Sequence, residues 1–151
     1  MTPLPEYIEF HEEGPREGFQ IEDRVFPLEE KAKLIEALAD TGLKQEQVGS
    51  FVNPRKVPQM ADTEALFAAI KKRPGVRYTA LWLNKHGLER ALKTPQVDID
   101  GKILLYTTDE LSIRNNNCSV VEGQQQQLEW MKIYADNGIE VESVAVMTAF
   151  G

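Results

Sequence analysis

Glu12-Glu-Gly-Pro-Arg-Glu-Gly-Phe-Gln-Ile-Glu22 begins where the first segment with a β-strand pattern ends. We expect that strand over Tyr7–Glu13, and the dipeptide Gly14-Pro15 is a turn signal directly after it. The segment Gly14–Gly18 has neither the spacing of a P-loop nor that of a dinucleotide-binding loop. The sequence therefore predicts a strand that runs into a polar turn without a known phosphate-binding motif.

Strand-like and helix-like segments alternate along the rest of the chain. The expected strands are Gln45–Phe51, Val76–Leu83, Lys102–Thr107 and Ile139–Met147, and the expected helices are Leu28–Thr41, Asp62–Lys72, Gly87–Leu92 and Val120–Asn137. This order predicts an α/β fold of parallel βαβ units with right-handed crossovers. The strands are apolar enough to be covered on both faces. The pattern alone allows an open doubly wound sheet or part of a barrel.

Periodicity also predicts the surroundings of single residues. In the second expected helix, Leu66, Ala69 and Ile70 should face inward, and Asp62 is the expected N-cap. The glutamine run Gln124–Gln127 should form a solvated face of the last helix.

Composition limits the classes of function. The chain has 151 residues, 42% of them hydrophobic, which suffices for one domain with a sizeable core. Its net charge of −7 argues against a nucleic-acid partner, which usually requires a basic patch. No apolar run approaches the roughly 20 residues that span a membrane. The single cysteine, Cys118, and the absence of a signal-peptide pattern lead us to expect a cytoplasmic protein.

Two further stretches have motif character, and with the first they point to one family. They are Val48-Gly-Ser-Phe-Val-Asn-Pro-Arg-Lys-Val-Pro-Gln-Met-Ala-Asp62 and Asp109-Glu-Leu-Ser-Ile-Arg-Asn-Asn-Asn-Cys-Ser119. The three stretches resemble the motifs E-x-G-P-R-D-G-x-Q-x-E, S-F-V-[SN]-P-x-x-V-P-Q-M and S-E-x-[FS]-x-x-x-N-x-N-C-S of hydroxymethylglutaryl-CoA lyases. The resemblance extends from Tyr7 to Gly151 and corresponds to the N-terminal half of the family.

The resemblance implies a (β/α)8 TIM barrel with its site in the loops at the C-terminal ends of the strands. Residues 1–151 would then be the N-terminal part of the barrel domain, with about five strands. The family uses a divalent metal, Mg or Mn, for retro-aldol (Claisen-type) cleavage of a 3-hydroxyacyl-CoA into an acyl-CoA and a carbonyl product. The alternative is a catalytically incomplete half-barrel that binds acyl-CoA or a protein partner.

The same resemblance assigns roles to residues near the first two strands. Arg16 matches the arginine that stabilises the thioester enolate, and a guanidinium suits that role. Glu17 stands where the family has a metal-binding aspartate, and Gln47 stands where it often has a glutamate. Ser50 matches a site serine, and Gln20 is expected to contact substrate. The departures at Glu17 and Gln47 suggest another 3-hydroxyacyl-CoA substrate or reduced activity.

Polar residues in later loops are weaker candidates. Arg55 and Lys56 are placed to meet the phosphates of coenzyme A, although solvated loop charges are the alternative. Asn84 and Asn115 are expected to order the site or its loops, and side-chain bonding within a turn is the alternative for Asn115. Cys118 does not match the mobile catalytic cysteine of the family and is expected to be a small buried residue.

The family's metal site also needs an H-x-H pair on a later strand. The only histidines here are His11 and His86, and neither lies in such a pair. The sequence therefore supplies at most one carboxylate ligand, so a monomer should bind the metal weakly or not at all. A five-stranded partial barrel also leaves strand edges and apolar faces open. We expect a homo-oligomer or a missing C-terminal half to cover them.

Overall fold

The computed structural model describes residues 4–150, which fall into two compact units. Unit 1 comprises the residues up to Leu81 together with Lys93–Asp98. Unit 2 comprises Trp82–Leu92 and the residues from Ile99 onward. Within the described part of the chain, no helix is long and apolar enough to cross a membrane.

Unit 1 is built on a parallel sheet of three strands, β1 (His11–Glu12), β2 (Gln45–Ser50) and β3 (Arg77–Leu81), in the order β1-β2-β3. A bulge shifts the register of β2 against β3 between Gln47 and Gly49. Every residue of β2 after its first is buried, so this central strand is covered on both faces, as expected for a parallel sheet.

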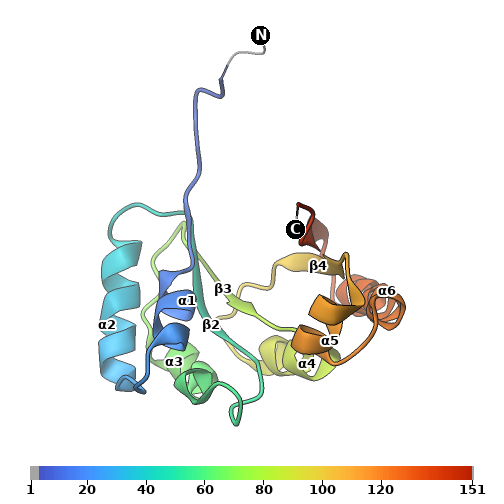
Figure 1. Ribbon diagram of the computed structural model, residues 1–151. Helices are drawn as coiled ribbons and strands as arrows, with labels where there is room; N and C mark the ends of the chain where they lie inside the picture. Colours follow the sequence, from blue (N-terminus) through green and yellow to red (C-terminus); the bar gives the residue numbers. More distant parts are fainter. Residues whose placement is uncertain (1–3, 151) are drawn as a thin grey trace. The chain divides into compact units, whose positions relative to one another are not determined.

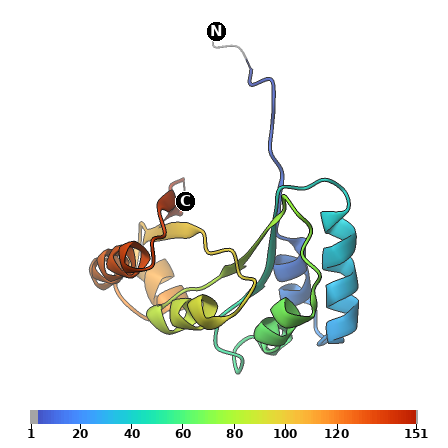
Figure 2. The same ribbon diagram turned by 180° about the vertical axis from the view of Figure 1, so that it is seen from behind.

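Three α-helices and a 3-10 turn complete unit 1. They are α1 (Gly14–Ile21), α2 (Leu28–Ala39), η1 (Pro58–Met60) and α3 (Thr63–Ala69). Helix α1 packs against β2, and α2 packs against α3 (Figure 1 and, from behind, Figure 2). The apolar core between these elements includes Ile35, Val48, Phe51, Leu66, Phe67 and Tyr78.

Unit 2 contains the two parallel strands β4 (Gly101–Tyr106) and β5 (Val141–Met147). Its helices are α4 (Lys85–Lys93), α5 (Asp109–Asn116) and α6 (Val120–Asp136), and α6 packs along β4. Helix α6 begins with a capping box, because Ser119 and Glu122 satisfy each other's backbone N–H groups.

Aromatic residues hold α6 to the rest of unit 2. Trp130 and Tyr134 are buried on the inner face of the helix. The Tyr134 hydroxyl donates to the carbonyl of Lys102 at 3.0 Å and accepts from the indole N–H of Trp82 at 3.3 Å. Burial raises the pKa of Tyr134 to about 12, so this hydroxyl keeps its proton and its hydrogen bond to β4.

Two helices lie where the sequence predicted a turn and a loop. Helix α1 forms where a turn was expected. Pro15 lies at its start, where a backbone N–H group would have no partner within the helix, so the missing N–H of proline costs nothing. Helix α5 fills the stretch after β4. The Thr108 side chain accepts from the N–H of Leu111 at its start, and Asn117 takes a left-handed conformation (φ 58°) at its end. These local caps outweigh the polar composition that favoured irregular structure.

The first strand is much shorter than expected. Only His11 and Glu12 pair with β2, whereas the prediction was Tyr7–Glu13. Phe10 is 72% exposed, so the residues before His11 gain no burial from joining the sheet. The other expected strands and helices are present with ends shifted by a few residues.

Three predictions about single side chains were wrong in detail. Ala69 is exposed, and Phe67 takes its place in the core beside Leu66 and Ile70. Asp62 precedes α3 but makes no capping hydrogen bond, because its Oδ1 accepts from the buried ammonium of Lys31 at 2.8 Å. Gln127 is buried rather than solvated, and its Oε1 accepts from the backbone N–H of Leu104 at 3.0 Å.

Candidate functional site

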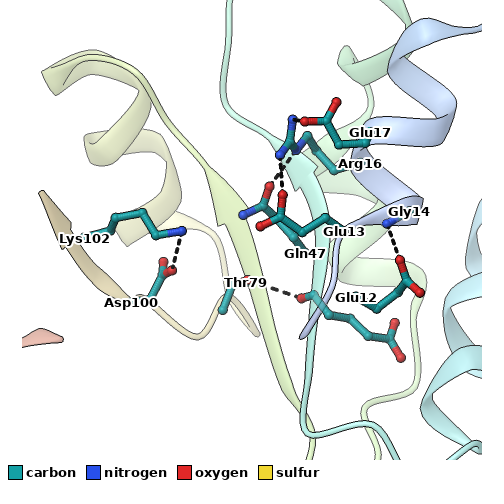
Figure 3. Close-up of polar contacts among 10 residues, drawn as sticks. Glu12, Glu13, Gly14, Arg16, Glu17, Gln47, Thr79, Asp100 and Lys102 are labelled. Carbon is teal, nitrogen blue, oxygen red and sulfur yellow. Dashed lines mark hydrogen bonds and ion pairs between the residues drawn. The ribbon is translucent and has the colours of Figure 1, made fainter. Parts of the chain in front are cut away.

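The guanidinium of Arg16 is the centre of a buried polar cluster in unit 1. Arg16 lies in the first turn of α1 and is 7% exposed. Its Nε donates to Oε1 of Gln47 on β2 at 2.6 Å, and its Nη2 donates to Oε2 of Glu13 at 2.8 Å. Its Nη1 pairs with the carboxylate of Glu17, so the three partners surround the arginine (Figure 3). The structure thus brings together Arg16, Glu17 and Gln47, three of the candidate site residues.

The backbone at the start of α1 fixes where Arg16 lies. The carboxylate of Glu12 accepts from the N–H of Gly14 at 2.6 Å, directly after β1. A Cβ at Gly14 would lie 2.8 Å from that carboxylate oxygen, so a larger residue there would require the Glu12 side chain to move. The carbonyl of Glu13 accepts from the N–H groups of Arg16 and Glu17 at 3.0 and 2.7 Å. The polar stretch after β1 is therefore a rigid helical turn.

Gln47 and Ser50 lie on β2, both buried. Gln47 carries no charge, and its oxygen serves as an acceptor for Arg16. The hydroxyl of Ser50, at the C-terminal end of β2, is buried without a hydrogen-bond partner among residues 4–150. An unpartnered buried hydroxyl costs free energy unless a ligand or water satisfies it, which marks Ser50 as a candidate contact for a bound molecule.

Glu46 on β2 is a fully buried carboxylate that the sequence motifs did not single out. Neither of its carboxylate oxygens has a hydrogen-bond partner in the described part of the chain. Glu46 lies opposite Glu12 on β1 and Tyr78 on β3 in the sheet register. Burial, and secondarily the charge of Glu12, raise the pKa of Glu46 from 4.5 to about 7. Its charge, within a strand expected to be covered on both faces, was the signal available in the sequence.

Glu17 and Gln20 follow Arg16 on α1 and are more accessible. The side chain of Glu17 is 53% exposed, and Gln20 is half-buried. Gln20 lies four residues after Arg16, so both lie on one side of the helix. Over residues 4–150, no group of three His, Cys, Asp or Glu side chains is arranged to hold a metal ion. Glu17 is therefore a single carboxylate that pairs with Arg16, and these residues do not form a metal site by themselves.

Arg55 and Lys56, in the loop after β2, are exposed, as expected for charges in a solvated loop. Arg55 and Lys56 lie in a turn in which Asn53 accepts from both backbone N–H groups, through its side chain for Arg55 and its carbonyl for Lys56. Both side chains are therefore accessible to a ligand.

The two asparagine candidates lie in unit 2. Asn84 is exposed, and its Oδ1 accepts from the N–H of Gly87 at 2.9 Å, which caps the start of α4. Asn115 is exposed on α5 rather than in a loop. Cys118, after α5, is buried beside the hydroxyl of Ser112, in agreement with the prediction of a small buried residue.

Curated proteins that resemble this chain are lyases of hydroxymethylglutaryl-CoA. The chain is 37% identical to the 3-hydroxy-3-isohexenylglutaryl-CoA/hydroxy-methylglutaryl-CoA lyase of Pseudomonas aeruginosa. The 123 aligned residues are 82% of this chain and 40% of that protein. It is 40% identical to the cytoplasmic 3-hydroxy-3-methylglutaryl-CoA lyase of Mus musculus. These 122 aligned residues are 81% of this chain and 35% of that protein. No model of a protein family matches the chain.

Solved structures give the same result. The hydroxymethylglutaryl-CoA lyase of Pseudomonas aeruginosa matches with a TM-score of 0.82 and 34% identity, over 93% of this chain and 47% of that one. An HMG-CoA lyase from Acinetobacter baumannii, in complex with coenzyme A and 3-methylmalate, matches with a TM-score of 0.83 and 25% identity, over 100% and 48% of the two chains. The chain belongs to the hydroxymethylglutaryl-CoA lyase family.

Family membership decides between the two architectures that the sequence allowed. The five parallel strands of this lyase-family chain are part of a TIM barrel and not of an open doubly wound sheet. The chain spans less than half the length of the relatives and structures to which it was compared, in the N-terminal part of the family's fold. The predicted family and fold class are both confirmed.

Proposed function

We propose that the protein catalyses the cleavage of a carbon–carbon bond in a 3-hydroxyacyl-CoA, as the names of its relatives indicate for them. The observation that carries this proposal is the buried Arg16, which stands at the family's motif position and is held by partners from α1 and β2. For hydroxymethylglutaryl-CoA itself the products would be acetyl-CoA and acetoacetate.

The reaction needs a cation where negative charge develops. The substrate hydroxyl loses its proton, its carbon becomes a carbonyl, and the electron pair of the broken bond passes to the thioester as an enolate that is then protonated. A guanidinium has five N–H donors, of which Gln47, Glu13 and Glu17 engage three in Arg16. The two that are left can donate to the thioester oxygen, and a fixed donor stabilises the transition state most when water is excluded.

The other residues near Arg16 would bind and orient the substrate. The unpartnered hydroxyl of Ser50 is suited to donate to a substrate oxygen. Gln47 is an amide and cannot remove a proton, so its role is to hold Arg16. Gln20 and the exposed Arg55 and Lys56 would contact the acyl and phosphate groups of coenzyme A. We also propose substrate-binding roles for Asn84 and Asn115, which are both exposed.

A divalent metal, Mg or Mn, belongs to the same proposal through the family. When bound, it would polarise the oxygen that becomes the carbonyl. Glu17 offers one exposed carboxylate toward such an ion, but residues 4–150 do not fit a complete metal site. We therefore assign no reaction step to a metal through these residues.

Part of the surface of unit 2 suggests an additional contact. On β5, Val141, Val144, Val146 and Met147 are 38 to 56% exposed, which is unusual for apolar residues of a parallel strand. We propose that a second copy or a C-terminal half of the barrel covers them. Light scattering with size-exclusion chromatography of the 151-residue chain separates the two, because only self-association gives a dimer mass.

We propose a cytoplasmic location. One relative from Mus musculus is named cytoplasmic, whereas another from Rattus norvegicus is named mitochondrial. Fractionation of cells that produce the tagged protein tests this, and recovery in any compartment other than the cytosol would contradict it.

The function is tested by mixing the protein with hydroxymethylglutaryl-CoA and Mg²⁺ or Mn²⁺ and following both products by mass spectrometry. Formation of acyl-CoA and oxo-acid in equal amounts is the expected result. Binding of the thioester without cleavage would instead support a half-barrel that binds acyl-CoA, and failure of both would reject the proposal.

A further inference from the structure

Glu13 contributes a carboxylate to the Arg16 cluster from a position where the family motif specifies no residue. The motif E-x-G-P-R begins with Glu12, and Glu13 occupies its variable position. Its Oε2 accepts from Nη2 of Arg16 at 2.8 Å, with 46% of the Glu13 side chain exposed and 9% of the Arg16 side chain exposed.

The backbone of Glu13 is fixed by the same turn that carries Arg16. Glu13 is the N-cap residue of α1, and its carbonyl accepts from the N–H groups of Arg16 and Glu17. Only side-chain torsions then have to be ordered to form the ion pair. A negative charge at the start of a helix is also favourable, because the helix N-terminus carries a partial positive charge.

The donor next to Nη2 on the guanidinium meets a neutral group. Gln47 supplies an amide oxygen to Nε at 2.6 Å, at a position where the family motif often has a glutamate. Glu17, the other anionic partner, has the more exposed side chain of the two glutamates, 53% against 46%. Arg16 therefore has its neutral partner on β2 and both of its anionic partners on or beside α1.

We propose that Glu13 is a positioning residue for Arg16, and that its carboxylate supplies the negative charge that Gln47 lacks. Glu13 and Gln47 together hold the adjacent donors Nη2 and Nε of the guanidinium, and Glu17 on Nη1 is then not needed to hold it. The consequence for catalysis rests on the proposed lyase function. The positioning itself does not, because it is a property of the unliganded chain.

The direct test is hydrogen exchange of the Arg16 Nε–H group, followed by nitrogen-15 NMR on the 151-residue chain. Glu13→Gln should raise its exchange rate about fivefold, equivalent to ~1 kcal/mol. Glu13→Asp should retain part of the protection, because the charge remains. Glu6→Gln removes one negative charge from an exposed position of the same unit and should leave the rate unchanged.

A compensating change makes the test specific. In the Glu13→Gln background, Gln47→Glu returns a carboxylate to the guanidinium from β2 and should restore the slow exchange. A general loss of packing would not be repaired in this way. Unchanged exchange in Glu13→Gln, or faster exchange in Glu17→Gln than in Glu13→Gln, would overturn the proposal.

Two further readouts keep the result clear. If Glu13→Gln does not fold, the wild-type exchange rate must rise in about 1 M salt, where the Debye length is ~3 Å, and an unchanged rate overturns the proposal.

In the active protein, Glu13→Gln should lower kcat about fivefold with little change in KM. If the Glu6→Gln protein has no lyase activity, the proposed function has failed, and the exchange measurement still decides the role of Glu13.

Discussion

The carboxylate of Glu46 on β2 lies opposite Glu12 on β1 and is fully buried without a hydrogen-bond partner among residues 4–150. Burial raises its pKa from 4.5 to about 7, so the folded chain holds this proton more tightly than the unfolded chain does. The resulting stability is complete below pH ~4.5 and is lost as the pH rises through about 7.

We therefore expect the free energy of unfolding to fall by about 3 kcal/mol between pH 4.5 and pH 8, from this shift alone. Glu46→Gln, which stays neutral, should remove most of this dependence. Urea unfolding followed by circular dichroism at several pH values measures it, with Glu6→Gln as the control. An equally steep pH dependence in Glu46→Gln would show that other groups cause it.

Two hydroxyl groups in unit 1 offer a matched comparison. Thr63 Oγ1 can donate to the carbonyl of Ser50 at 3.1 Å and to that of Met60 at 2.8 Å. Ser50 Oγ has no hydrogen-bond partner among residues 4–150. Thr63→Val should lower the free energy of unfolding by about 1 kcal/mol, because it leaves those acceptors short of a donor. Ser50→Ala should leave stability unchanged or higher and weaken binding of acyl-CoA. Denaturant titration and calorimetry measure the two effects, and a destabilised Ser50→Ala would contradict this account.

Burial separates two ion pairs of similar geometry. Lys31 pairs with Asp62 at 2.8 Å and its side chain is 1% exposed, whereas Arg73 and Asp40 pair at 2.8 Å with at least half of each side chain exposed. Asp62→Ala leaves the buried ammonium of Lys31 without its counter-charge and should lower the free energy of unfolding by about 3 kcal/mol. Asp40→Ala should lower the free energy of unfolding by less than about 1 kcal/mol. Equal losses in the two variants, measured by urea unfolding, would mean that burial does not control these pairs.

The pairing of β4 with β5 depends on a glycine. A Cβ at Gly101 would lie 1.9 Å from the carbonyl oxygen of Glu140, whereas a Cβ at Gly123 would meet nothing closer than 3.7 Å. Gly101→Ala should therefore destabilise unit 2 by about 3 kcal/mol, and Gly123→Ala should be neutral or stabilising. Tryptophan fluorescence reports on this unit, which contains Trp82 and Trp130. Comparable stability of the two variants would contradict the β4–β5 contact.

The sequence predicted those features that depend on periodicity and ordered motifs. The alternation of apolar strands with helices such as Val120–Asn137 predicted the parallel α/β class, and the motif around Arg16 predicted the family. The buried contact of Arg16 with Gln47 joins residues 31 positions apart, and the motifs marked both as site residues without predicting this contact.

Features that depend on a single tertiary contact were not predictable in this way. Helix α1 begins with a glycine and a proline, and it forms because Glu12 and Glu13 accept from its first N–H groups. Gln127 is buried because one backbone N–H of β4 needs an acceptor. Glu46 is buried although polar residues usually face solvent, and its charge alone, between Gln45 and Gln47, does not predict that burial.

The central claim is that Arg16 is the cation of a carbon–carbon lyase site. The most direct measurement compares acyl-CoA and oxo-acid formation from hydroxymethylglutaryl-CoA by wild-type protein and by Arg16→Gln, with circular dichroism to show that both are folded. We expect kcat to fall by about a hundredfold or more, the usual cost of losing a donor at a developing oxyanion, with a smaller change in KM. A folded Arg16→Gln protein with wild-type kcat would contradict the account.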